Sequence, residues 1–165
     1  MSEKDKEHSI LYAKKYLEDL LSFFGLNTDV YATSEDDVIE LNIPSTHLNG
    51  FLIGQRGDTM RSLQFLVSQA LRQQEYELVR VNVDVADYKK QRAEHLAETA
   101  QDWIKKVKDS GEPFELKPMS PADRRTVHKT ASDAGLVTES VGEGRDRHII
   151  LRPADGPGVE TSEEE

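Results

Sequence analysis

Hydrophobic residues in the first part of the chain follow first a helical and then a strand-like spacing. Over residues 8–24 they recur every three or four positions, which predicts a helix, and Gly25 follows as a C-terminal cap. The expected buried face of this helix consists of Ile10, Leu17, Leu20, Leu21 and Phe24. Two strands are expected next, at 27–33 and at 38–43, separated by a short acidic turn.

The elements that follow have equally regular apolar positions. A short helix is expected at 46–53, a turn at 54–57, and then a longer helix. The apolar stripe of that longer helix consists of Met60, Leu63, Val67, Ala70 and Leu71. Alternating valines at 79–85 predict a third strand, and alternating Ile39, Leu41 and Ile43 are expected to face inward from the second. The order helix, strand, strand, helix, helix, strand indicates an α+β fold.

The second half of the chain has a different pattern. One long helix is expected at 87–109, ended by Gly111, with an apolar seam of Ala93, Leu96, Ala100, Ile104 and Val107. A strand at 114–117 precedes another helix, which starts at Ser120 as N-cap and continues to about residue 133. Two strands, at 136–140 and 147–153, then flank a turn. No internal repeat relates the two halves.

Composition narrows the class of protein. The 165 residues carry a formal net charge of -10, contain no cysteine, and include no apolar run of membrane-spanning length or signal-peptide character. The five histidines are scattered without the spacing of metal ligands, so we expect no metal and no cofactor. A bacterial-type cytoplasmic protein that does not insert into a membrane is the resulting expectation.

The acidic charge is unevenly distributed. The last twelve residues hold five acids and no base, broken up by Gly and Pro, and are expected to be disordered. Residues 117–153 hold seven Lys or Arg against five Asp or Glu, so a phosphate-binding face can exist there. We therefore divide the chain into a first module at 1–86, a connecting helix at 87–111, a second module at 112–153 and an acidic tail at 154–165.

The turn between the two helices of the first module carries the first candidate chemistry. Gly54 and Gly57 enclose Gln55 and Arg56, and glycine lets a backbone approach another chain closely. The turn leads into a helix N-terminus, whose positive dipole end favours an anion. Neither a Walker loop nor a dinucleotide fingerprint fits, because no Lys-Ser/Thr follows and the turn joins two helices. Simple glycine caps at a helix corner are the alternative.

This glycine turn resembles the GXXG loop of the KH domain, which clamps a few nucleotides of a single strand. The element order is similar to that of the type II KH domain, α-β-β-α-α-β. The resemblance implies that Gly54, Gln55, Arg56 and Gly57 contact nucleic acid.

A second candidate site is expected on the helix of the second module. Arg124 and His128 are four residues apart and share a helix face that borders Val127 and Ala131. An arginine fork and an imidazole in this position suit a phosphate, although a solvated helix face is the simpler interpretation. The pair and the two strands after it resemble the R-3-H domain, named for its Arg-x-x-x-His signature. Further candidates for nucleic-acid contacts are Arg125, Arg145 and Arg147.

A KH module, a long helix and an R-3-H module together resemble the Jag family, also called SpoIIIJ-associated, KhpB or EloR proteins. The resemblance covers about residues 8–153 and implies an RNA chaperone or post-transcriptional regulator linked to cell shape, cell elongation and envelope synthesis. It also implies pairing with a small single-KH protein. Many members have an additional N-terminal domain whose counterpart is not seen in this sequence.

We accordingly expect a non-enzymatic protein that binds single-stranded RNA, with single-stranded DNA as an alternative ligand. Two other classes stay open. An Arg/His phosphodiesterase would need a further general acid or base beside Arg124 and His128, and the sequence offers no convincing carboxylate cluster. A protein–protein adaptor is compatible with the acidic surface.

Overall fold

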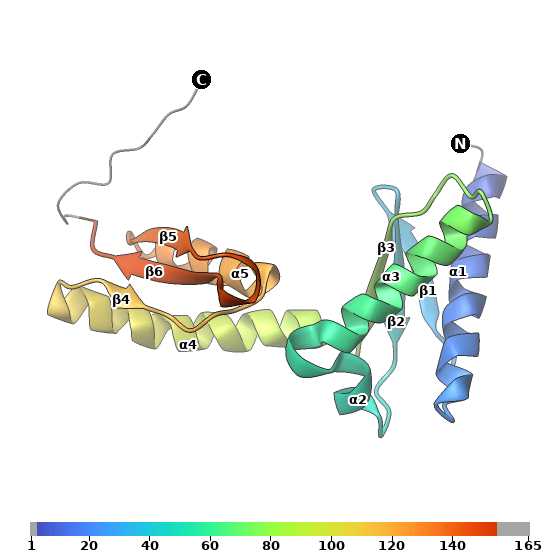
Figure 1. Cartoon of the computed structure of the whole chain (residues 1–165), viewed down its shortest axis with the longest axis horizontal. Coiled ribbons are helices and arrows are strands. Elements are labelled where there is room, and N and C mark those ends of the chain that lie inside the picture. The colour runs from blue at the N-terminus through green and yellow to red at the C-terminus, as the bar shows by residue number, and fades with distance from the viewer. Residues whose placement is uncertain (1–2, 155–165) are drawn as a thin grey trace. The chain divides into compact units, whose positions relative to one another are not determined.

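The computed structural model describes residues 3–154, which form two compact units that divide between Lys90 and Gln91: unit 1 before this point and unit 2 after it. The acidic tail expected to be disordered lies outside the described residues, except for Ala154. Both units combine helices with a small sheet, which confirms the α+β class (Figure 1).

The elements of unit 1 occur in the expected order. They are α1 (Glu3–Phe23), β1 (Tyr31–Glu35), β2 (Val38–Ile43), α2 (Asn49–Ile53), a short 3-10 turn η1 (Gln55–Gly57), α3 (Asp58–Gln73) and β3 (Val81–Val85). The sheet order is β1-β2-β3; β1 pairs antiparallel with β2, and β3 pairs parallel with β2. The order matches the expected one, while the KH assignment of this unit stays a prediction.

Helices α1 and α3 lie side by side against one face of this sheet (Figure 1). The predicted stripe of α3 is buried throughout, from Met60 to Leu71, as are the three inward residues of β2. Val81, Val83 and Val85 of β3 complete the same core. The helical and strand periods of the sequence therefore predicted most of this core correctly.

Several predicted boundaries in unit 1 were wrong for identifiable reasons. The first strand spans Tyr31–Glu35 rather than 27–33, because its partners in β2 begin at Val38. The short helix begins only at Asn49. Before it, the backbone N–H groups of Thr46 and Leu48 donate to the side-chain oxygens of Asn49 and Thr46, and these local hydrogen bonds hold a turn in place of the first helical residues. Phe24 was expected on the buried face of the first helix. It follows the last residue of α1, is 44% exposed and contacts the ring of Phe51.

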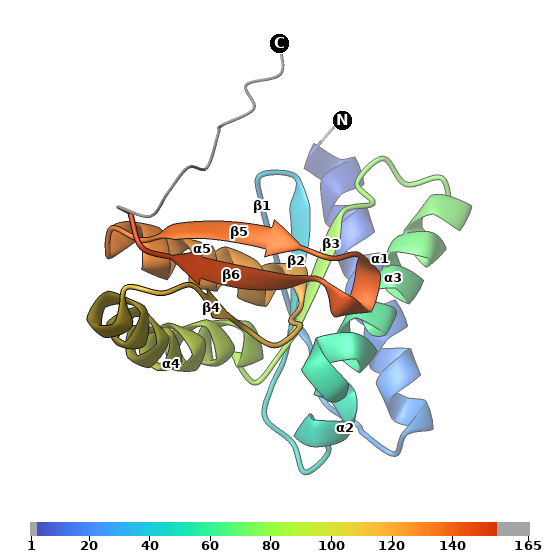
Figure 2. The same ribbon diagram turned by 60° about the vertical axis from the view of Figure 1, so that its left-hand side comes forward.

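Unit 2 is built around one core shared by two helices and a second sheet. Its elements are α4 (Tyr88–Ser110, which begins in unit 1), β4 (Phe114–Glu115), α5 (Pro121–Asp133), β5 (Val137–Val141), η2 (Gly144–Asp146) and β6 (His148–Arg152). All pairings in the order β4-β6-β5 are antiparallel (Figure 2). The strand expected at 114–117 is only two residues long.

Helix α4, expected as a connector, contributes to this core. Leu96, Ala100, Ile104 and Val107 are buried together with Val127 and Ala131 of α5 and with Ile149 and Leu151 of β6. Ser120 accepts a hydrogen bond from the backbone N–H of Asp123, as expected for the N-cap of α5. Arg92 of α4 pairs with the buried Asp123 at 3.0 Å, which joins the start of α5 to α4.

Candidate functional site

The loop between α2 and α3 has a geometry that requires glycine at its first position. Gly54 has φ 70° and ψ -176°, a conformation that residues with a Cβ atom rarely adopt. A Cβ atom at Gly54 would lie 2.3 Å from Oγ1 and 2.9 Å from the backbone N of Thr59. The α2–α3 corner is therefore tighter than any other residue type allows, while Gln55 and Arg56 at its tip are exposed.

The tip of the loop is held by Arg61, a residue that no sequence motif points to. Arg56 has φ 54°, in the left-handed region that non-glycine residues seldom enter. The Nη1 atom of Arg61 donates a hydrogen bond of 2.9 Å to the Arg56 carbonyl oxygen, and Nη2 pairs with the Asp58 carboxylate. Asp58, which as an isolated charge would oppose phosphate binding, thus positions the arginine that supports the loop.

Helix α3 begins at Asp58, directly after the loop. Its N-terminal dipole consequently points at the displayed residues, and the Arg56 side chain adds a full positive charge. The local chemistry is that of an anion clamp on a backbone turn. The four loop residues expected to bind together are adjacent in the structure; their role in binding stays a prediction.

A groove of about 350 Å³ runs between α3 and the beginning of β3. Gln64 and Ser68 form its floor: the Gln64 side chain accepts from the Val83 N–H at 3.1 Å, and Ser68 donates to the Val79 carbonyl at 2.7 Å. Three arginines line the groove, Arg61, Arg72 and Arg80. Reasoning from sequence missed these arginines, because only the packing of α3 against β3 brings them together.

Lys89, at the start of α4, belongs to the same unit and is engaged within it. Its Nζ donates to the side-chain oxygen of Asn82. Burial lowers the pKa of Lys89, Asp84 and Glu40 counteract this effect, and Arg61 adds to it. Lys89 is therefore engaged within unit 1.

Arg124 and His128 lie on α5 in unit 2, one turn apart as expected. His128 is exposed, and its Nδ1 is hydrogen-bonded to Oγ1 of Thr138 on β5, which fixes the ring and leaves Nε2 as its other polar atom. Arg124 is half-buried, and its Nε has no hydrogen-bond partner among the described residues. A buried donor without a partner is costly, so this arginine is held at the edge of the core at the expense of stability.

The other basic candidates of unit 2 differ in exposure and in their hydrogen bonds. Arg125 and Arg145 are exposed, whereas Arg147 donates to the Gly142 carbonyl oxygen at 2.8 Å and so stabilises the β5–β6 turn. His148 is partly buried; its Nδ1 lies 2.8 Å from the Asp146 carbonyl oxygen and its Nε2 lies 2.6 Å from Glu115. The hydrogen bond to Asp146 and then the Glu115 carboxylate raise the pKa of His148.

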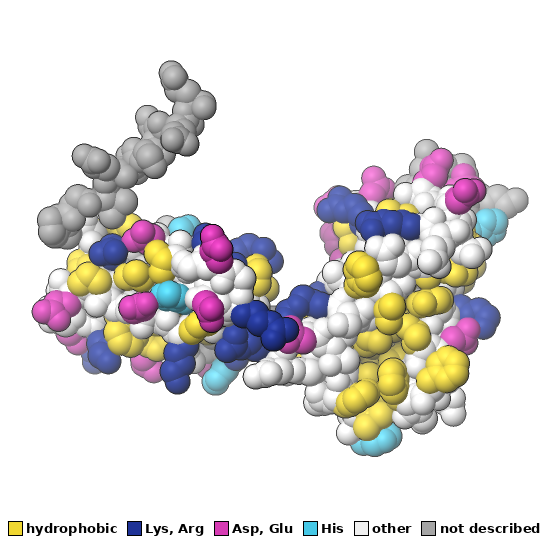
Figure 3. Space-filling view, viewed as in Figure 1, with side chains coloured by type: hydrophobic (Ala, Val, Ile, Leu, Met, Phe, Trp, Pro, Cys, Tyr) yellow, Lys and Arg dark blue, Asp and Glu magenta, His cyan; other side chains and the backbone are white. Residues whose placement is uncertain are grey.

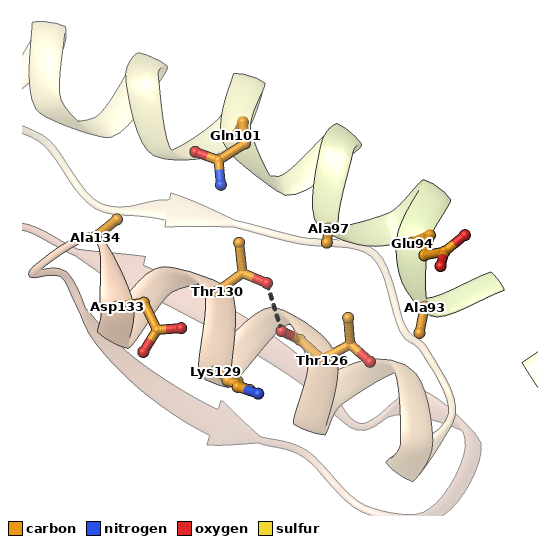
Figure 4. A pocket seen from close by; sticks show the side chains of 9 residues that line it. All are labelled: Ala93, Glu94, Ala97, Gln101, Thr126, Lys129, Thr130, Asp133 and Ala134. Carbon is orange, nitrogen blue, oxygen red and sulfur yellow. Dashed lines mark hydrogen bonds between the residues drawn. The ribbon is translucent and has the colours of Figure 1, made fainter. Parts of the chain in front are cut away.

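A second, larger cavity of about 660 Å³ lies between α4 and α5 (Figure 4). Its walls are formed by small side chains, among them Ala93, Ala97 and Thr130, and Figure 4 shows that charges of both signs accompany them. The cavity therefore lacks the single charge sign of the groove in unit 1.

No group of three or more His, Asp or Glu side chains within residues 3–154 could hold a metal ion. No helix in the same range is long and apolar enough to cross a membrane.

Comparison with known proteins identifies the class of unit 2: residues 94–153 match the R-3-H domain. The chain is also 33% identical over 141 residues to the RNA-binding protein KhpB of Clostridium symbiosum, an alignment that covers 84% of this chain. It is 28% identical over 150 residues, or 89% of the chain, to the protein of the same name from Bacillus subtilis (strain 168).

The chain belongs to the KhpB family, also called the Jag family. It spans 64% of the length of the Clostridium symbiosum relative and 72% of the Bacillus subtilis one. A third relative of the same name, from Lactiplantibacillus plantarum, is 30% identical over 81% of the chain, which spans 41% of that protein.

Proposed function

We propose that this protein binds single-stranded RNA, with the α2–α3 loop as the main clamp on the RNA backbone. The observation that carries the proposal is the loop itself. A glycine at which any Cβ atom would overlap Thr59, an exposed Arg56 in a left-handed conformation, and the start of α3 converge at one point. Membership in a family whose relatives are named RNA-binding proteins supports RNA as the ligand.

The proposal gives unit 2 a second, weaker contact. Arg124 would direct its guanidinium group, and His128 its second ring nitrogen, toward a phosphate of the same strand. Arg125 and Arg145, both exposed, would add less specific attraction. Two tethered weak sites then gain affinity through effective concentration.

The proposed role in the cell follows from the family and not from the geometry. We propose a non-enzymatic cytoplasmic RNA chaperone or post-transcriptional regulator that affects cell elongation and envelope synthesis. Pairing with a small single-KH protein is part of the same proposal. Copurification of such a protein and of RNA with the tagged chain tests this part.

The decisive experiment changes Gln55 and Arg56 to Asp in the full chain. The flanking glycines and the Arg61 hydrogen bond to the main chain are retained, so folding should be preserved. Two carboxylates would then face the phosphates and oppose the helix dipole. We expect affinity for labelled single-stranded RNA to fall at least about tenfold, or about 1.4 kcal/mol.

The matched control replaces the exposed Gln101 and Lys105 of α4 by Asp. Both double variants change the net charge by the same amount, because each replaces one neutral and one basic residue. The control should bind nearly as wild type. Equal affinities for the loop variant and wild type would contradict the clamp, and shortening of the labelled RNA during titration would favour the phosphodiesterase alternative.

A further inference from the structure

The groove between α3 and β3 extends away from the loop and becomes more basic at its far end. Arg61 lines the end near the loop and is already paired with Asp58. Arg72, in the last turn of α3, and Arg80, just before β3, line the other end. Figure 3 shows Lys and Arg side chains gathered where β3 starts.

Arg72 and Arg80 differ from several other basic residues of unit 1, which have partners within the described part of the chain. Lys6, Lys14 and Lys15 all form ion pairs with acids of the unit. By contrast, neither the Arg72 nor the Arg80 side chain has an ion pair or hydrogen bond to a described residue. Their guanidinium groups are exposed and available to an external anion.

The residue types that line the groove also favour the binding of an anion. None of its lining residues is acidic, although the chain has 31 Asp and Glu against 21 Lys and Arg. In such a protein, a hollow with three arginines and no carboxylate concentrates positive potential locally. The exposed ring of Phe65, 60% accessible, lies on the same wall and offers a surface on which a base can stack.

Strand β3 forms part of the groove wall, and some of its backbone groups are already occupied. Its Val83 N–H is occupied by Gln64, and the Val79 carbonyl just before the strand is occupied by Ser68. The guanidinium groups that line the groove recognise phosphate rather than base identity.

We propose that Arg72 and Arg80 form a second phosphate site in unit 1, which fixes the length of single strand that the unit holds. This inference rests on the proposed function. Arg72 lies fourteen helical steps after Asp58, a distance of about 21 Å along α3. A stacked strand advances about 3.4 Å per nucleotide, so about six nucleotides, or fewer if unstacked, connect the loop to the second site.

The test compares the full wild-type chain with an Arg72→Gln/Arg80→Gln variant. Both are titrated with labelled oligouridylates of about three to ten nucleotides, a range typical of single-strand sites. The variant should bind the shortest oligomers as wild type does, but oligomers of six or more about tenfold more weakly. For these longer oligomers, the plot of log affinity against log salt should be less steep by about 1.4, or about 0.7 per lost phosphate contact.

A Lys105→Gln/Lys108→Gln variant removes the same charge from the exposed face of α4 and should bind all lengths as wild type. Equal affinities of the Arg72/Arg80 variant and wild type at every length would overturn the proposal. An equal loss at every length would do the same, because the shortest oligomers cannot span the groove.

A second measurement separates this inference from the function on which it rests. Inorganic pyrophosphate is added to the wild-type chain, and the Arg side-chain Nε–H signals are followed by NMR. If the signals of Arg72 and Arg80 shift, the anion site is supported. If they shift but RNA does not bind, the proposed RNA-binding function is wrong and the anion site is still supported. If pyrophosphate shifts neither signal, the second phosphate site is wrong.

Discussion

Replacing Gly54 by Ala should destabilise unit 1 much more than the same change at two neighbouring glycines. The new methyl group would overlap both the hydroxyl and the backbone nitrogen of Thr59. Thr59 lies in the first turn of α3, so the overlap cannot be relieved by a side-chain rotation alone. Relief requires α3 to move away from α2, which disturbs the core that Met60 and Leu63 complete.

The expected loss of folding free energy follows from the geometry at each of the three glycines. At Gly54, the backbone strain costs about 1–3 kcal/mol and the overlap a similar amount, or about 3 kcal/mol or more in total. At Gly57, φ is also positive, but the nearest atom to a Cβ would be 3.4 Å away, so the cost is about 1–2 kcal/mol. Gly50 is helical and faces open space, where Ala should be neutral or stabilising by up to about 1 kcal/mol.

The two units carry separate fluorescent reporters. All five tyrosines lie within residues 1–90, whereas the single tryptophan, Trp103, packs against the core of unit 2. In urea, with a slope of about 1–3 kcal/mol per M, Gly54→Ala should lower the tyrosine-detected midpoint by about 1 M or more. The Trp103 transition should not move. Equal shifts for Gly54→Ala and Gly57→Ala would refute the reasoning, since both would then reflect only a positive φ.

Three further predictions concern the candidate site and unit 2. Arg61→Ala removes the side chain that donates a hydrogen bond to the Arg56 carbonyl oxygen, so RNA affinity should fall about tenfold and the loop amides should exchange hydrogen faster. An unchanged exchange rate would mean that the loop keeps its conformation without Arg61. Changing Arg124 and His128 together to Ala should weaken RNA binding with the helical circular dichroism intact, whereas a lower melting temperature at unchanged affinity would make the pair structural. The raised pKa of His148 means that its stabilising contribution is present below about pH 6.5 and is lost as pH rises through the raised value. His148→Gln should therefore reduce the change with pH of the unfolding free energy detected by Trp103, above about pH 6.5. If this pH dependence is unaltered, groups other than His148 cause it.

Local patterns were sufficient to predict most elements of both units. The apolar stripe of α3 and the alternation along β2 each specify one buried face, because side-chain direction repeats with a fixed period in helices and strands. The N-cap of α5 was equally local, since the Ser120 side chain bonds an N–H three residues away. The glycine turn could be located for the same reason: both its glycines and its displayed residues are contiguous.

Features that depend on contacts between residues far apart in the chain could not be predicted from these local patterns. The sequence by itself determined the element order and the loop, through periods and caps that act within a few residues. Only the tertiary structure decided where β1 starts, because pairing with β2 sets that limit, and why Phe24 lies beside Phe51. It also brought Arg80 to the groove that α3 lines, because packing joins residues that no sequence period relates.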